Sequence, residues 1–160
     1  MKFERFEDFP VWKDSIALVV SIFKMTRDKR FGGLGDIANQ IQRAGLSVSN
    51  NIAEGFERGT TQELISFLYY ARGSAGEVRS ILLVLERLDG LDDLNSEILN
   101  LRSVAEPVSR QIRGWTSALQ NIPIRGQRYL NKQTKSIFEQ EKSCKAFKET
   151  LKQYYQPPVS

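Results

Sequence analysis

The sequence contains no histidine and a single cysteine, Cys144. Without histidine, Ser-His-Asp and Cys-His nucleophilic machinery is excluded, and so is the commonest transition-metal ligand. With only one cysteine, a structural zinc site of the Cys/His type cannot be built. A carboxylate-only magnesium site or a two-carboxylate hydrolase would need acidic residues that converge in a pocket, and the sequence shows no such spacing. We therefore expect a protein that is no enzyme, uses no cofactor and holds no metal.

Long apolar runs are absent as well. The longest apolar stretch without a charge lies within Ser15–Phe23, far short of the roughly 20 residues that a membrane span needs. The N-terminal Met1–Arg5 is charged and leads into no apolar secretion segment. A lone thiol forms no internal disulfide, which is typical of reducing compartments. These features predict a cytoplasmic protein with no membrane contact.

Charge is unevenly divided along the chain, whose net charge is +4. Residues 1–126 hold 16 Lys/Arg and 16 Asp/Glu, so this part is neutral overall. Residues 127–160 hold seven Lys/Arg against three Glu and carry the whole excess. Such a basic tail attracts phosphate backbones or an acidic protein face, or it is simply a solvated tail. The sequence leaves these alternatives open.

Four segments with helical hydrophobic periodicity follow one another. The first helix is expected to begin near Asp8 as its N-cap, with Pro10 in the first turn, where proline is tolerated. A Gly-rich turn over 27–35 leads to a second helix, whose end is predicted at Gly55 because glycine can adopt the left-handed conformation there. The apolar stripes of these two helices are Trp12, Ile16, Val19, Val20 and Phe23, then Leu34, Ile37, Ile41, Ala44, Val48 and Ile52.

The third helix follows Thr60, whose hydroxyl is predicted to form a capping box with Glu63, each side chain binding the other's backbone N–H. This helix is expected to run to about Asp89, and a fourth follows the apolar stripe over 94–119. Pro107 falls inside that stripe. We expect a kink or a break there, because an interior proline costs about 3 kcal/mol.

Four long helices joined by short turns, with no strand pattern, predict an all-α fold. Its architecture would be an up-down-up-down antiparallel four-helix bundle over residues 6–122. Residues 123–160 form a basic C-terminal extension in which the periodicity weakens. A thin apolar stripe there indicates a fifth, partly exposed helix over about 133–154.

The second and third helices are expected to meet along a polar seam. If their turn is centred near residue 58, facing residues have numbers that sum to about 117, which pairs Ser47 with Tyr70 and Gly45 with Gly73. The polar side chains of this seam either satisfy one another and fix the register, or form a contact surface for another subunit or ligand. We favour a role in structure or in subunit assembly. The seam residues are Arg43, Ser47, Asn50, Asn51 and Glu54 on the second helix, and Arg72, Ser74 and Glu77 on the third.

Aromatic residues cluster near the same seam. Phe67, Tyr69 and Tyr70 lie at successive angles around the third helix, so they cannot all point into one core. With Phe56 nearby, at least one ring is expected to face outward, where it would either stack on bases or be buried in a protein interface. We favour the interface. Its candidate residues are Arg43, Asn50, Asn51, Glu54, Phe56, Arg58, Tyr69, Tyr70 and Arg72.

Four segments carry a resemblance to a known family. They are Phe6–Lys13 (FEDFPVWK), Gln40–Ala44 (QIQRA), Ser49–Gly55 (SNNIAEG) and Phe67–Glu77 (FLYYARGSAGE). In this order they resemble the four-helix-bundle family whose founding members are encoded in intervening sequences of bacterial 23S rRNA genes. The resemblance spans about residues 6–120 and implies a bundle that assembles into a homopentameric, barrel-like ring.

The resemblance also implies a partner. The same fold is used by accessory proteins of diversity-generating retroelements, which bind a reverse transcriptase and its template RNA and have basic surfaces. The neutral bundle of this chain departs from that pattern, so the tail would supply the positive charge. The candidate RNA contacts in the tail are Arg125, Arg128, Lys132, Lys135, Lys142, Lys145 and Lys148.

We therefore expect a non-catalytic homo-oligomer, pentameric by resemblance, that binds RNA, a reverse transcriptase, or both. The alternative is a purely structural protein–protein interaction module without nucleic-acid contact.

Overall fold

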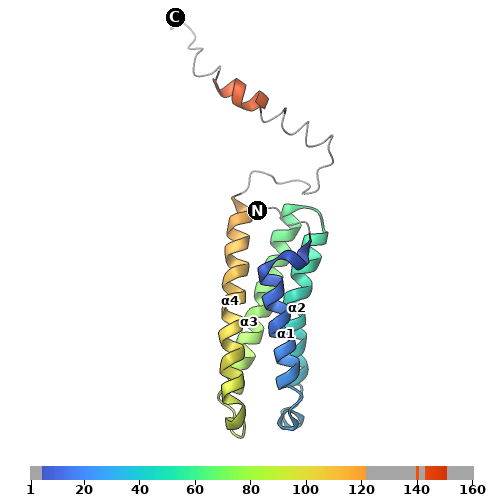
Figure 1. The fold of residues 1–160 in the computed structure, drawn as a ribbon, viewed down its shortest axis with the longest axis vertical. Helices are drawn as coiled ribbons and strands as arrows, with labels where there is room; N and C mark the ends of the chain where they lie inside the picture. Colours follow the sequence, from blue (N-terminus) through green and yellow to red (C-terminus); the bar gives the residue numbers. More distant parts are fainter. Residues whose placement is uncertain (1–4, 122–139, 141–142, 151–160) are drawn as a thin grey trace, which may run out of the picture. The chain divides into compact units, whose positions relative to one another are not determined.

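The structure is a computed structural model that describes residues 5–121, 140 and 143–150. Four long helices dominate it: α1 (Pro10–Met25), α2 (Ile37–Glu57), α3 (Thr61–Leu85) and α4 (Asn95–Gln120) (Figure 1). Short 3₁₀ helices occupy Phe6–Asp8, Lys29–Gly33 and Asp92–Leu94. The residues that the structure describes contain no strand, and the predicted all-helical bundle is confirmed.

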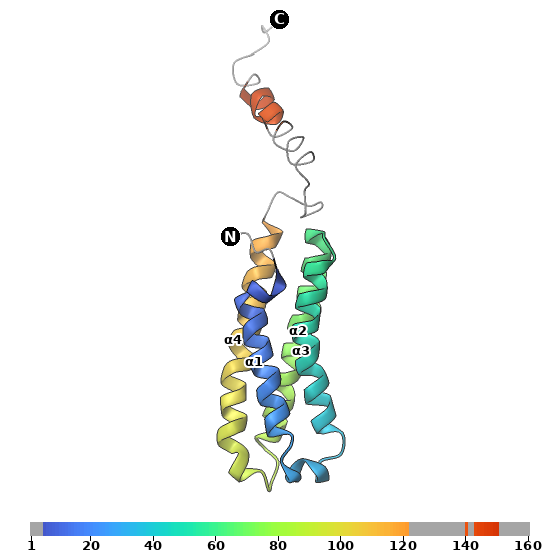
Figure 2. The same cartoon turned by 45° about the vertical axis from the view of Figure 1, so that its right-hand side comes forward.

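The helices pack as a cycle of neighbours, α1 on α2, α2 on α3, α3 on α4 and α4 on α1. The turns after α1 and α3 lie at one end of the bundle and the turn after α2 lies at the other (Figures 1 and 2). Fully buried side chains from all four helices form the core, among them Leu18, Ile52, Leu68 and Ile112. The predicted stripes of α2, α3 and α4 supply most of this core. The stripe predicted for the first helix was wrong: α1 buries Val11, Leu18, Val19, Ile22 and Met25, whereas only Val19 of the predicted set is buried and Val20 is 47% exposed.

The first helix begins one residue later than predicted, because its N-cap is Phe9 and not Asp8. Asp8 closes the 3₁₀ helix, and Phe9 occupies the N-cap of α1 with Pro10 at the first helical position. The Phe9 ring is buried against Trp115 and Phe56, with ring centroids 4.4 and 5.1 Å away. No side-chain hydrogen bond caps the start of α1. The burial of the Phe9 ring therefore fixes where the helix begins.

The second helix continues past Gly55, so the predicted end was wrong. It runs to Glu57, and Gly59 is the residue that takes the left-handed conformation, with φ of +81°. Gly55 is buried inside α2, where a Cβ would lie 2.6 Å from the Cβ of Phe67 and 3.4 Å from the Cα of Leu64. Its missing side chain lets α2 and α3 approach closely.

This longer helix shifts the register of the α2/α3 seam. The Ser74 hydroxyl donates to the Ser47 hydroxyl at 2.9 Å, so facing residues have numbers that sum to 121 rather than 117. Ser47 therefore faces Ser74 and not Tyr70. Gly45 faces α1, where a Cβ would lie 2.9 Å from Cδ1 of Ile22, and the predicted contact with Gly73 does not form.

The turns at the two ends of α3 follow local rules. The Thr60 hydroxyl accepts from the Glu63 backbone N–H at 3.2 Å, as the capping box predicts. The Glu63 carboxylate accepts from the Thr60 hydroxyl at 2.6 Å and does not bind the backbone donor expected for it. At the other end α3 stops at Leu85, earlier than predicted, and Gly90 has φ of +83° in the turn to α4.

Helix α4 runs through Pro107 without the break that was offered as one alternative. Proline has no N–H and so removes the backbone hydrogen bond to the Ser103 carbonyl. Because Ser103 is exposed, water can solvate this carbonyl. Ala105 and Val108, on either side, are fully buried. Packing on both sides of the proline thus holds the helix in one piece.

The chain divides into two compact units, Met1–Gly126 and Gln127–Ser160. In the second unit, residues 143–150 are helical and exposed, and the rest of the predicted helix over 133–154 lies outside the described residues, apart from helical residue 140. Among the helices that the structure describes, none is long and apolar enough to cross a membrane.

Candidate nucleic-acid interface

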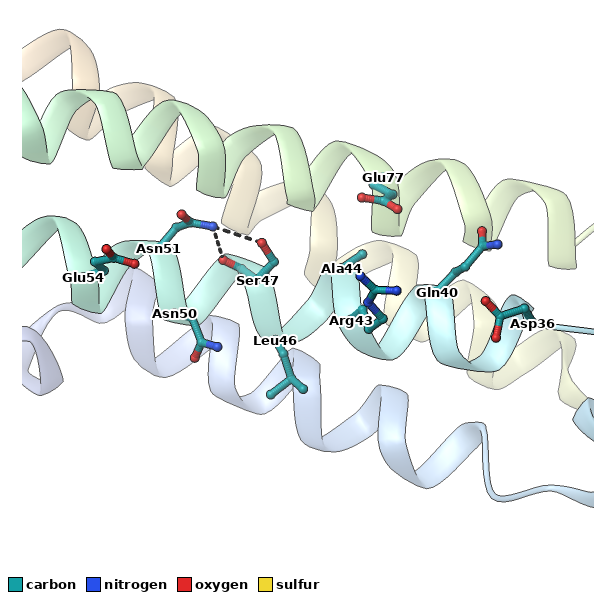
Figure 3. A pocket seen from close by; sticks show the side chains of 10 residues that line it. All are labelled: Asp36, Gln40, Arg43, Ala44, Leu46, Ser47, Asn50, Asn51, Glu54 and Glu77. Atoms are coloured by element: carbon teal, nitrogen blue, oxygen red, sulfur yellow. Dashed lines mark hydrogen bonds between the residues drawn. The ribbon is translucent and has the colours of Figure 1, made fainter.

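A polar groove of about 680 Å³ follows α2 on the side of α3. We call it the α2/α3 groove. Glu77 projects from α3, and the other lining side chains come from α2 or its start (Figure 3). Four of the nine predicted interface residues meet here. The groove is lined by Asp36, Gln40, Arg43, Ala44, Leu46, Ser47, Asn50, Asn51, Glu54 and Glu77.

Some of these side chains serve the fold. Asn51 donates from Nδ2 to the backbone oxygen of Ser47 at 2.7 Å and to its hydroxyl at 3.0 Å, and that hydroxyl also meets Ser74 of α3 (Figure 3). This chain of hydrogen bonds fixes the pairing of the two helices. Glu54 pairs with Arg58 one turn on at 2.6 Å, and this hydrogen bond raises the pKa of the Arg58 guanidinium. The pair is half exposed and contributes little stability.

Other side chains of the α2/α3 groove are open to a partner. Arg43 and Glu77 form no ion pair among the described residues. The lining contains three carboxylates, Asp36, Glu54 and Glu77, against the Arg43 guanidinium, and Glu54 is compensated by Arg58. The local charge is therefore slightly negative, which suits a protein surface better than a phosphate backbone.

The predicted aromatic patch is split over three places. Phe56 is only 5% exposed and belongs to the core, so its assignment to an interface was wrong. Tyr70 is 62% exposed, and its ring packs edge-on against Phe67 at 5.8 Å. Tyr69 turns the other way around α3, where the Arg72 guanidinium lies 5.5 Å from its ring centroid. Residues 69 and 70 thus lie on different seams of the bundle.

A second groove, of about 440 Å³, lies between α3 and α4. We call it the arginine groove, because four arginines and one serine line it: Arg72, Arg79, Ser109, Arg110 and Arg113. Only Arg72 was among the predicted site residues.

Two contacts between α3 and α4 set the ends of this seam. At one end Arg102 donates to the Glu86 carboxylate at 2.5 Å, and at the other Gln120 Nε2 donates to the Tyr69 hydroxyl at 2.8 Å. The residue numbers within each bonded pair sum to almost the same value, 188 for Glu86 and Arg102 and 189 for Tyr69 and Gln120. The two helices are therefore antiparallel in one constant register. That register sets Arg113 beside Gly76, between the levels of Arg72 and Arg79.

The arginine groove is positively charged. Arg110 pairs with Glu106 at 2.8 Å in an exposed contact, and Arg72 rests on Tyr69. Arg79 and Arg113 form no ion pair with any described residue. The neutral charge count of the bundle therefore conceals an uneven distribution, positive at the α3/α4 seam and negative at the α2/α3 groove.

A signal in the sequence could have found this groove. Arg72 and Arg79 are seven residues apart and Arg110 and Arg113 are three apart, so each pair lies on one helix face. The same pairing rule, applied to the third and fourth helices about the turn at 90–92, would have set Arg72 opposite Arg110.

Of the predicted tail contacts, Lys145 and Lys148 lie in the exposed helical residues 143–150. The other five, Arg125, Arg128, Lys132, Lys135 and Lys142, lie outside the described residues. Within the described ranges, no three His, Cys, Asp or Glu side chains gather as metal ligands would.

The fold and its two grooves define an all-helical bundle that presents polar interhelical surfaces of opposite charge. Residues 7–114 match the family described as 23S rRNA-intervening sequence protein, and the chain belongs to this family. A solved structure from Bacteroides thetaiotaomicron is similar in fold, with a TM-score of 0.59 and 19% identity over 66% of this chain and 97% of that one. It is described as a protein with unknown function from the S23 ribosomal protein family. No curated protein matches this chain.

Proposed function

We propose that this chain is a cytoplasmic, non-catalytic, homo-oligomeric protein that binds the phosphate backbone of RNA. The arginine groove is the observation that supports this proposal. A guanidinium is always charged and presents a planar fork of donors that fits two phosphate oxygens at once. The ammonium group of a lysine has no such fork. Three arginines of the groove, Arg72, Arg79 and Arg113, form no ion pair with a described carboxylate, and an incoming phosphate would pair with them.

The assembly part of the proposal draws on the family resemblance, which implies a pentamer. The α2/α3 groove is the surface we assign to a protein partner, either a neighbouring subunit or a reverse transcriptase. Its unpaired Arg43 and Glu77, with exposed Leu46 and Tyr70 close by on the same helices, favour that role. The same features support the alternative, a purely structural interaction module, if RNA does not bind.

Binding of a labelled single-stranded RNA to the full chain, measured by fluorescence anisotropy over a series of salt concentrations, tests the proposal. The binding constant K falls as salt rises, and each lost phosphate contact should make the slope of log K against log salt shallower by about 0.7. We expect this shallower slope for Arg79→Gln and for Arg113→Gln. Arg27→Gln is the matched control, since it removes the same charge from the exposed turn after α1.

The tail is tested in the same assay. Lys145→Gln with Lys148→Gln removes two exposed charges outside the bundle. If only this double variant changes the slope, the tail binds RNA and the groove does not. If no variant differs from Arg27→Gln, the proposed RNA contact is wrong and the interaction-module alternative stands.

Oligomeric state is measured separately, by size-exclusion chromatography with light scattering. A pentamer has five times the 18.3 kDa mass of the chain. Glu54→Ala, which also frees Arg58, should weaken the assembly if the α2/α3 groove is a subunit contact. A monomeric wild-type protein would contradict the assembly part of the proposal alone.

A further inference from the structure

One end of the arginine groove carries an exposed aromatic ring. Tyr69 is 43% exposed, and the guanidinium of Arg72 lies 5.5 Å from its ring centroid. Its hydroxyl accepts a hydrogen bond from Gln120 of α4 at 2.8 Å. This bond holds the ring on the α3/α4 seam, beside the cations and not over the core.

The cations and the ring form a line parallel to the helices. Arg79 and Arg72 are seven residues apart, which is about 10 Å along α3, and Tyr69 lies about 5 Å further on. The register of the seam inserts Arg113 of α4 between the two α3 arginines. Gly76, at the level of Arg113 on α3, lacks a side chain, and a Cβ there would meet no atom within 4 Å, so the space beside it is open.

We propose, building on the proposed function, that the arginine groove selects single-stranded RNA, with Tyr69 stacking on one unpaired base. Arg79, Arg113 and Arg72 bind successive phosphates of that strand. An aromatic side chain next to a positively charged track is the arrangement by which proteins hold single strands without reading their sequence. In a duplex the bases are stacked on one another, so Tyr69 could gain no such contact.

The size of the site agrees with a strand. A groove of about 440 Å³ falls in the range that takes a ligand of small-molecule size. It therefore takes a nucleotide or two with their phosphates. Because Arg72, Arg110 and Arg113 are exposed, the phosphates of a duplex could also reach them, and selection then comes from the stacked base.

Tyr70 provides an internal comparison. It is more exposed than Tyr69, but it lies on the other side of α3 with Phe67. The cation beside these rings is Arg58, 5.3 Å from the Phe67 ring centroid, and its charge is already paired with Glu54 at 2.6 Å. A strand stacked on Tyr70 would therefore meet one paired arginine in place of the arginine groove. Tyr70→Leu is therefore the matched control for Tyr69→Leu, because both remove one exposed tyrosine from the same helix.

The test uses the full chain and a labelled 12-nucleotide RNA, alone or annealed to its complement, at one fixed salt concentration. Wild type should bind the single strand at least fivefold more tightly than the duplex. Tyr69→Leu should weaken single-strand binding about tenfold, within the range for loss of one base stack, and leave duplex binding unchanged. Tyr69→Phe keeps the ring and should retain most of the preference, and Tyr70→Leu should behave like wild type.

Failure of this inference can be told apart from failure of the proposed function. If Arg79→Gln and Arg113→Gln weaken binding but single strand and duplex bind equally well, the groove contacts RNA and the selection is wrong. If Tyr69→Leu and Tyr70→Leu have the same effect, stacking on Tyr69 is wrong. A changed oligomer mass for Tyr69→Leu, with RNA binding intact and an unchanged circular dichroism spectrum, would make the ring a protein contact and overturn the inference.

Discussion

Gly55 lies where α2 and α3 approach closely, and its replacement gives a sharp test of the packing. A Cβ at this position would be 2.6 Å from Phe67 Cβ, 3.3 Å from Leu64 Cδ1 and 3.4 Å from Leu64 Cα. The nearest atom is the first carbon of a side chain and cannot swing aside as a side-chain tip can. Gly55→Ala therefore forces the two helices apart or distorts one of them.

The expected size of the effect combines two opposing contributions. Overpacking a well-packed site costs about 1 to 3 kcal/mol. Alanine is the better helix former and regains up to about 1 kcal/mol of that. Because 2.6 Å is far below the 3.4–4 Å of ordinary van der Waals contact, we expect the upper part of the cost and a net loss of about 1 to 2 kcal/mol in the free energy of unfolding.

Gly73→Ala is the matched control, since Gly73 also lies inside a long helix but a Cβ there would meet no atom within 4 Å. It should stabilise the protein by about 0.5 to 1 kcal/mol through helix propensity alone. Urea denaturation followed by circular dichroism, at equal protein concentrations, measures both. If Gly55→Ala is as stable as Gly73→Ala, the close approach of α2 and α3 described here is wrong.

Three further substitutions test local features. Thr60→Ala removes the N-cap that binds the Glu63 N–H and should lower the free energy of unfolding by about 1 kcal/mol in the same denaturation assay; an unchanged midpoint would contradict the cap. Pro107→Ala should raise stability by about 1 to 3 kcal/mol, because the helix is already continuous there and regains a backbone bond; a loss would show that the proline ring itself is needed. The hydrogen bond from the Arg30 guanidinium lowers the pKa of Asp28 below its ordinary 3.8, so the charged carboxylate stabilises the folded state above that value. Asp28→Asn should therefore lower the Tm at pH 7, and the difference should shrink as the pH falls below 3.8 toward the lower folded-state pKa; a difference that does not change with pH would contradict the pairing.

Helix positions could be predicted because their signals are local. The apolar stripe of each helix repeats along its own sequence, and the cap at Thr60 depends on residues only three positions apart. Helix ends that depend on a partner could not be predicted. A glycine that ends a helix and a glycine that admits a neighbouring helix look alike in the sequence, so Gly55 was given the role that Gly59 performs. Pro107 shows the same limit, since the burial of Ala105 and Val108 outweighs its local penalty.

The candidate site was only partly predictable for a related reason. Helical spacing places Arg43, Asn50, Asn51 and Glu54 on one helix face, and all four line the α2/α3 groove. The arginine groove needs two helices in a known register, and a charge sum over the whole bundle discards position. Its positive charge is cancelled in that sum by carboxylates that lie elsewhere.

The arginine groove has a consequence for regulation. Every cation in its lining is a guanidinium, which stays protonated at any physiological pH and cannot be neutralised by acetylation as a lysine can. Its attraction for phosphate is therefore permanent and independent of pH. The exposed lysines at 145 and 148 are open to acetylation, so a cell that modifies this protein could adjust the tail while the groove keeps its charge.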